Sequence, residues 1–214
     1  MAQVGTGKRQ PPLFDLTGGN VCLDFINTLD DRPSSQPKEL LNEYRDLARF
    51  GENTGIVTPA EFQRLATKAR SEPSESEQAL WRARELREAL NEVFSAVESK
   101  QAASQTAIDK LNAVLHEAER HSRLVESEEG FAWRSDAASS TLTAILWPIA
   151  RAARDLLTSA QLPMVRKCSS PTCQWFFLDS SKNHRRRWCD MTTCGNRDKV
   201  RNFYARKRGA TETA

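Results

Sequence analysis

The sequence contains no long hydrophobic run. No apolar stretch approaches the roughly 18–20 residues that a bilayer-spanning helix needs, which excludes a helical membrane protein. Residues 1–12 are polar and lack the apolar segment of a signal peptide, so we predict a flexible tail there and a second one at 209–214. The resulting expectation is a soluble, cytoplasmic protein.

Catalytic signatures are also missing. The chain has no Gly-x-Ser-x-Gly, no glycine-rich phosphate loop and no His-Glu-x-x-His. His116 and His121 stand in a polar segment, which is typical of solvated histidines on a helix surface. Cys22 falls on the apolar side of a predicted helix, where a small core residue is expected and not a nucleophile. We therefore expect no enzymatic activity.

Charge and cysteine are distributed unevenly along the 214 residues. Residues 166–208 carry twelve Lys/Arg against three Asp, a net charge of +9, although the whole chain has only +3. Residues 1–165 carry 19 Lys/Arg against 24 Asp/Glu, a net charge of −5. Four of the five cysteines lie in the basic part. We therefore predict two domains, an acidic body at 13–160 and a basic module at 161–208.

Helical periodicity dominates the body. Asn20 is placed to cap one helix, and Thr58, followed by Pro59 and Glu61, forms the start signal of another. Pro148 lies within the strongest apolar stripe and is expected to kink its helix. The predicted fold class is therefore mainly α, a helical N-terminal domain with a small β-hairpin. The expected elements are a strand at 13–16, helices at 22–29, 38–52, 58–70, 78–100, 104–120 and 140–159, and a hairpin at 124–133.

The basic module contains two closely spaced cysteine pairs, Cys168-x4-Cys173 and Cys189-x4-Cys194. Each pair can supply two thiolates from one turn, and the loop between them can fold back to complete a tetrahedral zinc site. Two nested disulfides are the alternative, which a reducing cytosol disfavours. His184 is a substitute ligand in principle, but four cysteines already fill the coordination shell. We predict one structural Zn2+ ion per chain, with no open position for catalysis.

The zinc module is predicted to be a small four-cysteine zinc finger, a β-hairpin followed by a helix. About 45 residues cannot build a sufficient core without the metal. Residues 175–178 are typical of a strand, Gly195 of a tight turn and 196–207 of a helix. The apolar side of that helix is expected to pack against the zinc site; it consists of Val200, Phe203 and Tyr204.

Basic residues surround the predicted metal site. A basic helix beside a basic loop is typical of proteins that bind the phosphate backbone, although the run 185–187 could instead be a solvated charged surface. Trp175, Phe176 and Trp188 either stack on bases or form the core of the module. The candidate nucleic-acid contacts are Arg185, Arg186, Arg187, Arg197, Lys199, Arg201, Arg206 and Arg208.

Two motifs resemble a known family. Cys194-Gly195-Asn196-Arg197 is the signature of the CGNR zinc finger, and Arg186-Arg187-Trp188-Cys189-Asp190-Met191 is similar to the segment before it. The Gly18-Gly19 turn and Leu23-Asp24-Phe25-Ile26-Asn27-Thr28 resemble the start of the ABATE domain, the usual partner of that finger. The resemblance covers residues 13–208.

The resemblance implies a bacterial, stress-related transcription regulator with a DNA-binding zinc finger. The four cysteines correspond to the zinc ligands, and Arg187 and Arg197 correspond to candidate nucleic-acid contacts. Asn196 is expected to cap the final helix. Asp24, Asn27 and Thr28 are expected to be local structural groups.

These features together predict a zinc-binding, DNA-binding transcription regulator whose N-terminal domain acts as a sensor or interaction module. RNA binding and a protein-interaction scaffold with a structural zinc are the alternatives. A single zinc module contacts few bases, so specific recognition would need a homodimer or a second partner. The expected partners are nucleic acid, a second copy of the chain, and a small-molecule or protein effector of the body.

Overall fold

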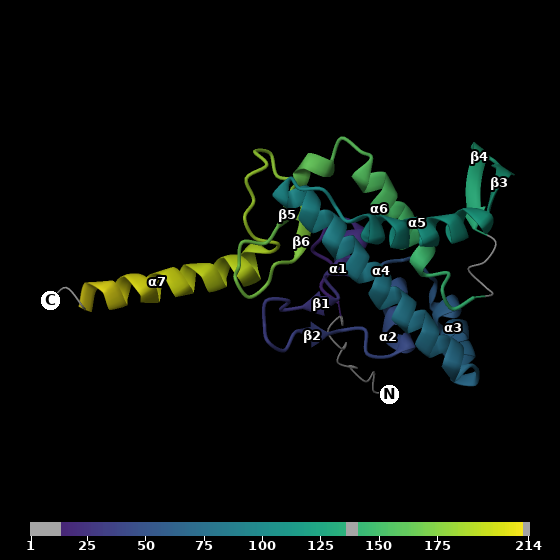
Figure 1. The fold of residues 1–214 in the computed structure, drawn as a ribbon, viewed down its shortest axis with the longest axis horizontal. Helices are drawn as coiled ribbons and strands as arrows, with labels where there is room; N and C mark the ends of the chain where they lie inside the picture. The colour runs from purple at the N-terminus through teal and green to yellow at the C-terminus, as the bar shows by residue number, and fades with distance from the viewer. Residues whose placement is uncertain (1–13, 136–140, 212–214) are drawn as a thin grey trace, which may run out of the picture.

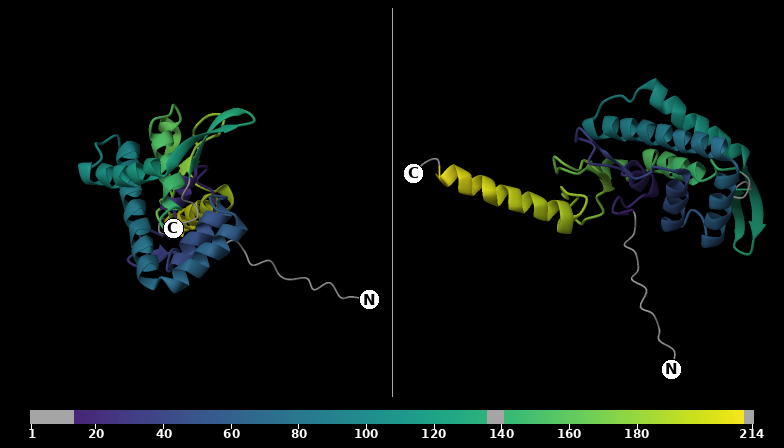
Figure 2. Two further views of the ribbon diagram at one scale, coloured as in Figure 1. Left: turned by 90° about the vertical axis from the view of Figure 1, so that its right-hand side faces the viewer. Right: turned by 90° about the horizontal axis from the view of Figure 1, so that it is seen from below.

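The computed structural model describes residues 14–135 and 141–211, with residues 135 and 205–211 described by their backbone only. Helices form the body, α7 extends away from it, and the β3–β4 hairpin lies at the opposite end of the molecule (Figures 1 and 2). No helix in the described part of the chain is long and apolar enough to cross a membrane. The elements are α1 (Val21–Ile26), β1 (Leu29–Asp30), β2 (Lys38–Glu39), α2 (Tyr44–Asn53), α3 (Pro59–Ser71), α4 (Pro73–Ser99), α5 (Gln105–Arg120), β3 (Ser122–Ser127), β4 (Gly130–Ser135), α6 (Leu146–Leu157), the 3-10 turn η1 (Leu162–Met164), β5 (Val165–Lys167), β6 (Phe176–Leu178), the π-helical turn η2 (Met191–Gly195) and α7 (Asn196–Thr211).

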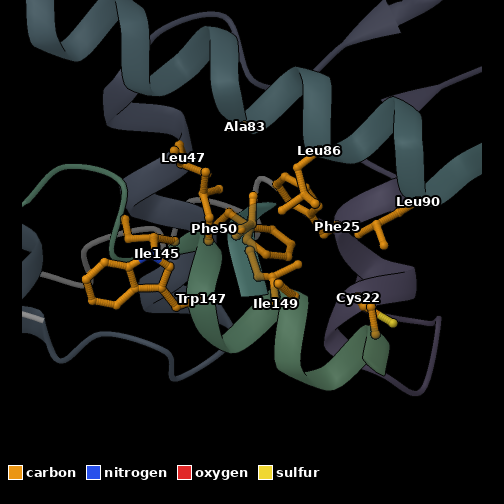
Figure 3. Close-up of a cluster of buried hydrophobic side chains, with 14 of the residues drawn as sticks. Cys22, Phe25, Leu47, Phe50, Ala83, Leu86, Leu90, Ile145, Trp147 and Ile149 are labelled. Atoms are coloured by element: carbon orange, nitrogen blue, oxygen red, sulfur yellow. The ribbon is translucent and has the colours of Figure 1, made fainter. Parts of the chain in front are cut away.

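The long helix α4 is the spine of the body. Its Ala83, Leu86 and Leu90 recur at helical spacing and face α1, α2 and α6 (Figure 3). Phe25 of α1 and Phe50 of α2 meet there, with ring centroids 5.6 Å apart. Cys22, predicted as a core residue, lies in the same buried cluster, and burial raises the pKa of its thiol far above the ordinary value. The predicted mainly α class is confirmed.

Local start signals place several elements where the sequence predicts them. Thr58 and Glu61 form the capping box of α3, and the Ser104 hydroxyl accepts from the Ala107 N–H at the start of α5. The hairpin is confirmed, with Leu124 opposite Trp133 and Glu126 opposite Phe131. His116 and His121 lie on the surface, and the His121 ring stacks on Trp147 at 4.7 Å.

The predicted helix 38–52 is wrong in its first half. Lys38 and Glu39 form β2, which pairs with β1, and α2 begins only at Tyr44. The reason is a long-range ion pair, because both carboxylate oxygens of Glu39 accept from the buried Arg87 of α4, at 2.6 and 2.7 Å. A separate capping box between Glu43 and Asp46 then starts α2.

Other boundaries differ for local reasons. Leu29 belongs to β1 and not to the first helix, and residues 14–16 form no strand. Residues 73–77, expected to precede the fourth helix, form its first turns. Pro148 lies at the third position of α6, where a missing N–H costs no intrahelical bond, so the expected kink is wrong. Residue 140, the predicted start of that helix, lies outside the described residues.

Candidate metal centre and nucleic-acid interface

Four cysteine thiols gather between the β5–β6 hairpin and the start of α7. Cys168 follows β5, Cys173 precedes β6, Cys189 lies in the following loop and Cys194 belongs to η2. All four are buried, and their sulfurs lie within 4.8 Å of one another. The Cys189 Sγ is 3.6 Å from the Cys173 Sγ and 3.7 Å from the Cys194 Sγ. These separations fit the edge of about 3.8 Å in a tetrahedron with Zn–S bonds of about 2.3 Å.

The five cysteines are free thiols, so the disulfide alternative is wrong. Hydrogen bonds from Cys173 and Cys189 hold the pKa of the Cys168 thiol far below its usual range. The same contacts with Cys168 raise the pKa of the Cys173 and Cys189 thiols, and burial does so for Cys194. One thiolate therefore makes deprotonation of the other three cysteines unfavourable in the same small volume. A divalent cation removes this conflict because it neutralises the charge of the thiolates. Four thiolate ligands leave no open coordination position, so the site holds one structural zinc ion.

Asp179 organises the loop between β6 and Cys189. Its carboxylate accepts from the backbone N–H groups of Ser181, at 3.0 Å, and Arg186, at 2.8 Å. Burial opposes ionisation, but the Ser181 hydroxyl and these N–H groups lower the pKa of the Asp179 carboxyl. His184 is not part of the ligand cluster, which among the described residues consists of the four cysteines; its Nδ1 lies 2.9 Å from the backbone oxygen of Asp179. Sequence reasoning missed Asp179, although an Asp before two serines is a signal for a local Asx turn.

The helix after the fourth cysteine begins at Asn196 as predicted, but a π-helical turn leads directly into it. Asp190 caps η2 by accepting from the Thr193 N–H at 2.6 Å, and the chain continues through Gly195 directly into α7. Asn196 is therefore not the cap; its amide donates to the Thr192 oxygen at 2.8 Å. Gly195 does not form the predicted turn. Its α-carbon lies close to Met191, whose sulfur would be 2.6 Å from an added Cβ.

The zinc module is joined to the body through β6. The Asn27 amide donates to the Phe176 oxygen and accepts from the Phe176 N–H, both at 2.9 Å. The Leu178 N–H donates to the Gly18 oxygen at 2.8 Å, and the Gly18 N–H donates to Asp24. Thus Asn27, expected to act locally, connects the body to a strand that is distant in sequence, whereas Asp24 acts locally on the Gly18 turn as expected.

The aromatic residues of the module divide between two cores. Phe176 is fully buried in the body core, 6.3 Å from the Phe94 ring centroid, so it cannot stack on a base. Phe177 is buried among the four cysteines. Trp175 and Trp188 are half-buried against the same cluster. Core packing is therefore the main role of these residues.

The predicted basic contacts differ in exposure. Arg186 faces inward, since its guanidinium donates to the Trp188 oxygen at 2.8 Å and to the Cys189 oxygen, and its Cζ lies 4.7 Å from the Phe177 ring centroid. This arginine braces the zinc loop. The residues that remain exposed are Arg185, Arg187, Arg197, Lys199 and Arg201. The side chains of Arg206 and Arg208 lie outside the described residues.

The expected packing of α7 on the zinc site is wrong. Val200, Phe203 and Tyr204 are 56%, 63% and 56% exposed, and only the first turns of the helix adjoin the metal centre. The reason is that α7 extends away from the body, and no other helix or strand of the described residues lies beside it (Figure 1). The helix also includes residues 209–211, so the predicted flexible tail at 209–214 is wrong for these three residues.

Arg197 stands beside a cleft of about 240 Å3 between the zinc site and the body. Asp15 and Asp30 line the same cleft from the body, together with Lys38. Burial, then the charges of Asp190 and Asp30, raise the pKa of the Asp15 carboxyl. The position of Arg197 is compatible with bracing the cleft and with reaching a nucleic acid outside it.

A buried four-thiolate site between a β-hairpin and a helix, attached to a helical body, defines a structural zinc-finger protein. The chain belongs to the ABATE family, described as "Putative stress-induced transcription regulator", whose model matches residues 19–160. The model of the CGNR zinc finger matches residues 164–207. The comparison with curated proteins finds no match to this chain. The resemblance seen in the sequence is thereby confirmed.

Proposed function

We propose that this protein is a non-enzymatic, cytoplasmic transcription regulator that binds DNA through its zinc module. The observation that carries the proposal is the uncovered basic helix α7, which follows the metal site directly and extends away from the body (Figure 1). Arg187 from the zinc loop and Arg197, Lys199 and Arg201 from α7 are exposed around it. The family descriptions, a transcription regulator and a zinc finger, support the same function.

Phosphate contacts supply the affinity in this proposal. Arg201 donates to Asp198 at 3.1 Å, an exposed pair that a phosphate can replace at little cost. With about five phosphates neutralised by the exposed residues, log K should fall against log salt with a slope of about −4 to −5 on duplex DNA. The body, with its net negative charge, would remain outside the duplex and present the effector surface.

The test is a titration of the zinc-loaded chain with labelled duplex DNA, single-stranded DNA and RNA at several salt concentrations, followed by fluorescence anisotropy. Arg187→Ala and Arg201→Ala should each weaken binding to all sequences and make the salt slope shallower by about one unit. Arg45→Ala, a change to an exposed arginine of the body, is the matched control and should leave the slope unchanged. Tighter binding to RNA than to duplex DNA at equal salt would replace this proposal with RNA binding.

Arg197 requires a separate measurement because it can brace the cleft or contact a base. If it contacts a guanine edge, Arg197→Ala should cost about 1–3 kcal/mol on a preferred site selected from random duplexes, and much less elsewhere. A bracing role would instead lower zinc retention and thermal stability. Absence of binding to every nucleic acid at roughly 50 mM salt, where phosphate contacts are strongest, would favour a protein scaffold.

A further inference from the structure

The β3–β4 hairpin exposes a large apolar surface far from the zinc module. The exposed apolar residues are Leu124, Phe131 and Trp133, at 56%, 74% and 70%. They share one face of the hairpin, because Phe131 and Trp133 are two residues apart on β4 and Leu124 lies opposite Trp133. Trp81 is also exposed, but it lies on α4 and not on the hairpin, and single exposed apolar residues are common on protein surfaces. Three large apolar side chains on one projecting ribbon are different and indicate an interaction surface.

The outer edge of β4 has unused hydrogen-bonding capacity. Apart from the β3–β4 ladder, no backbone hydrogen bond joins β4 to another element within the part of the chain that the structure describes. Two-stranded hairpins are marginal on their own, and proteins usually protect such edges with lysine, proline or a covering element. Here Phe131 and Trp133 stand on the edge strand itself. We propose that this edge pairs with the same edge of a second copy of the chain, forming a four-stranded sheet across a two-fold axis.

The residue order of β4 is complementary to itself. In an antiparallel pair centred on Ala132, Phe131 lies opposite Trp133 of the second copy, and the two-fold axis repeats that aromatic pair. Opposite residues of antiparallel strands share a face, so both pairs extend the apolar surface that begins at Leu124. Centring the pair one residue away, on Trp133, would instead place Phe131 opposite a serine.

Charge supports the same orientation. The tip of the hairpin carries Glu126, Glu128 and Glu129, whereas its base carries Arg123 and Arg134. An antiparallel pair places the acidic tip of one copy beside the basic base of the other. In the register centred on Ala132, Arg134 lies opposite Gly130 of the second copy, next to the turn that carries Glu128 and Glu129.

The size and position of this surface determine how strong the dimer is and which parts of the molecule it leaves uncovered. Two six-residue strands bury less than the roughly 1,600 Å2 of a standard interface, so a weak, concentration-dependent dimer is expected. Because the hairpin and α7 lie at opposite ends of the molecule, pairing leaves both basic helices uncovered (Figure 1). The dimer thereby carries two separate nucleic-acid modules, but its formation does not depend on DNA binding.

The experiment is sedimentation velocity of the full zinc-loaded chain, from about 1 to about 200 μM, a range that spans weak interfaces. Wild type should shift from monomer to dimer. Trp133→Ala should raise the dimer dissociation constant at least about tenfold, because it removes both symmetry-related aromatic pairs. Trp81→Ala, the matched loss of an exposed tryptophan, should leave the constant unchanged, and circular dichroism should show equal helicity in both variants.

A charge exchange tests the register. Arg134→Glu should weaken dimerisation, and Arg134→Glu combined with Glu128→Arg should restore it, which a merely sticky surface would not do. The competing apolar surface is on α7, so Phe203→Ala is the third comparison. A chain that stays monomeric at every concentration overturns the proposal. So does a dimer that Phe203→Ala abolishes and Trp133→Ala does not, or a charge exchange without rescue.

Discussion

Replacing Asn27 tests whether the zinc module is an independent domain or part of the body's fold. The Asn27 amide makes two hydrogen bonds of 2.9 Å with the N–H and the oxygen of Phe176. Both residues are buried, at 3% and 0% exposure, so bulk solvent does not reach these backbone groups in the folded protein. An unsatisfied buried polar group costs about 1–3 kcal/mol, and Asn27→Ala leaves two of them. We therefore expect the free energy of unfolding to fall by about 2–6 kcal/mol.

The assay is urea denaturation of the zinc-loaded chain, followed by tryptophan fluorescence and far-ultraviolet circular dichroism. Asn27→Leu keeps the volume but not the hydrogen bonds and should be about as destabilised as Asn27→Ala. Asn42→Ala changes an exposed asparagine and should stay within about 0.5 kcal/mol of wild type. Zinc transfer to a coloured chelator should be faster in both Asn27 variants, because β6 leads out of the metal site. If Asn27→Ala and Asn42→Ala unfold alike and release zinc alike, the proposed link between body and module is refuted.

Three further changes follow from the site. Cys173→Ser, or chelation of zinc, should expose 166–208 to proteolysis while most far-ultraviolet helicity remains; the melting temperature of the body should also fall, because Phe176 belongs to its core. Arg186→Ala should lower the free energy of unfolding by about 2 kcal/mol and speed zinc loss, since it removes two charge-assisted hydrogen bonds. Arg187→Ala should change DNA affinity only. Equal effects of the two variants on stability and zinc release would contradict the bracing role of Arg186. Burial raises the pKa of Asp24 to about 6 against the opposing hydrogen bond from the Gly18 N–H, so the folded state favours the protonated form. The stabilising contribution of the protonated Asp24 to the free energy of unfolding, about 3 kcal/mol, is therefore present below pH 4 and lost as the pH rises through 6. Asp24→Asn should flatten the dependence of stability on pH over that interval, as measured by denaturation at stepped pH.

The sequence by itself determined the parts of this protein that depend on neighbouring residues. Thr58 with Glu61, and Ser104 with Ala107, start helices through contacts three residues apart, so their positions follow from spacing alone. The zinc ligands belong to the same class, because each cysteine pair lies in one turn and four thiolates have one geometry around the metal. The β3–β4 hairpin was predictable for the same reason.

Only the tertiary structure decided the roles that depend on distant partners. Glu39 has a helical context in the sequence, but its ion pair with Arg87 places it in a strand. Adjacent arginines have identical chemistry, yet Arg186 is half-buried over Phe177, whereas Arg187 stays exposed over Trp188. The amphipathic pattern of α7 cannot show whether its apolar side is covered, since periodicity defines a face and not a neighbour. Asn27 is the extreme case, because the backbone groups that it satisfies lie 149 residues away and meet it only when the zinc module docks on the body.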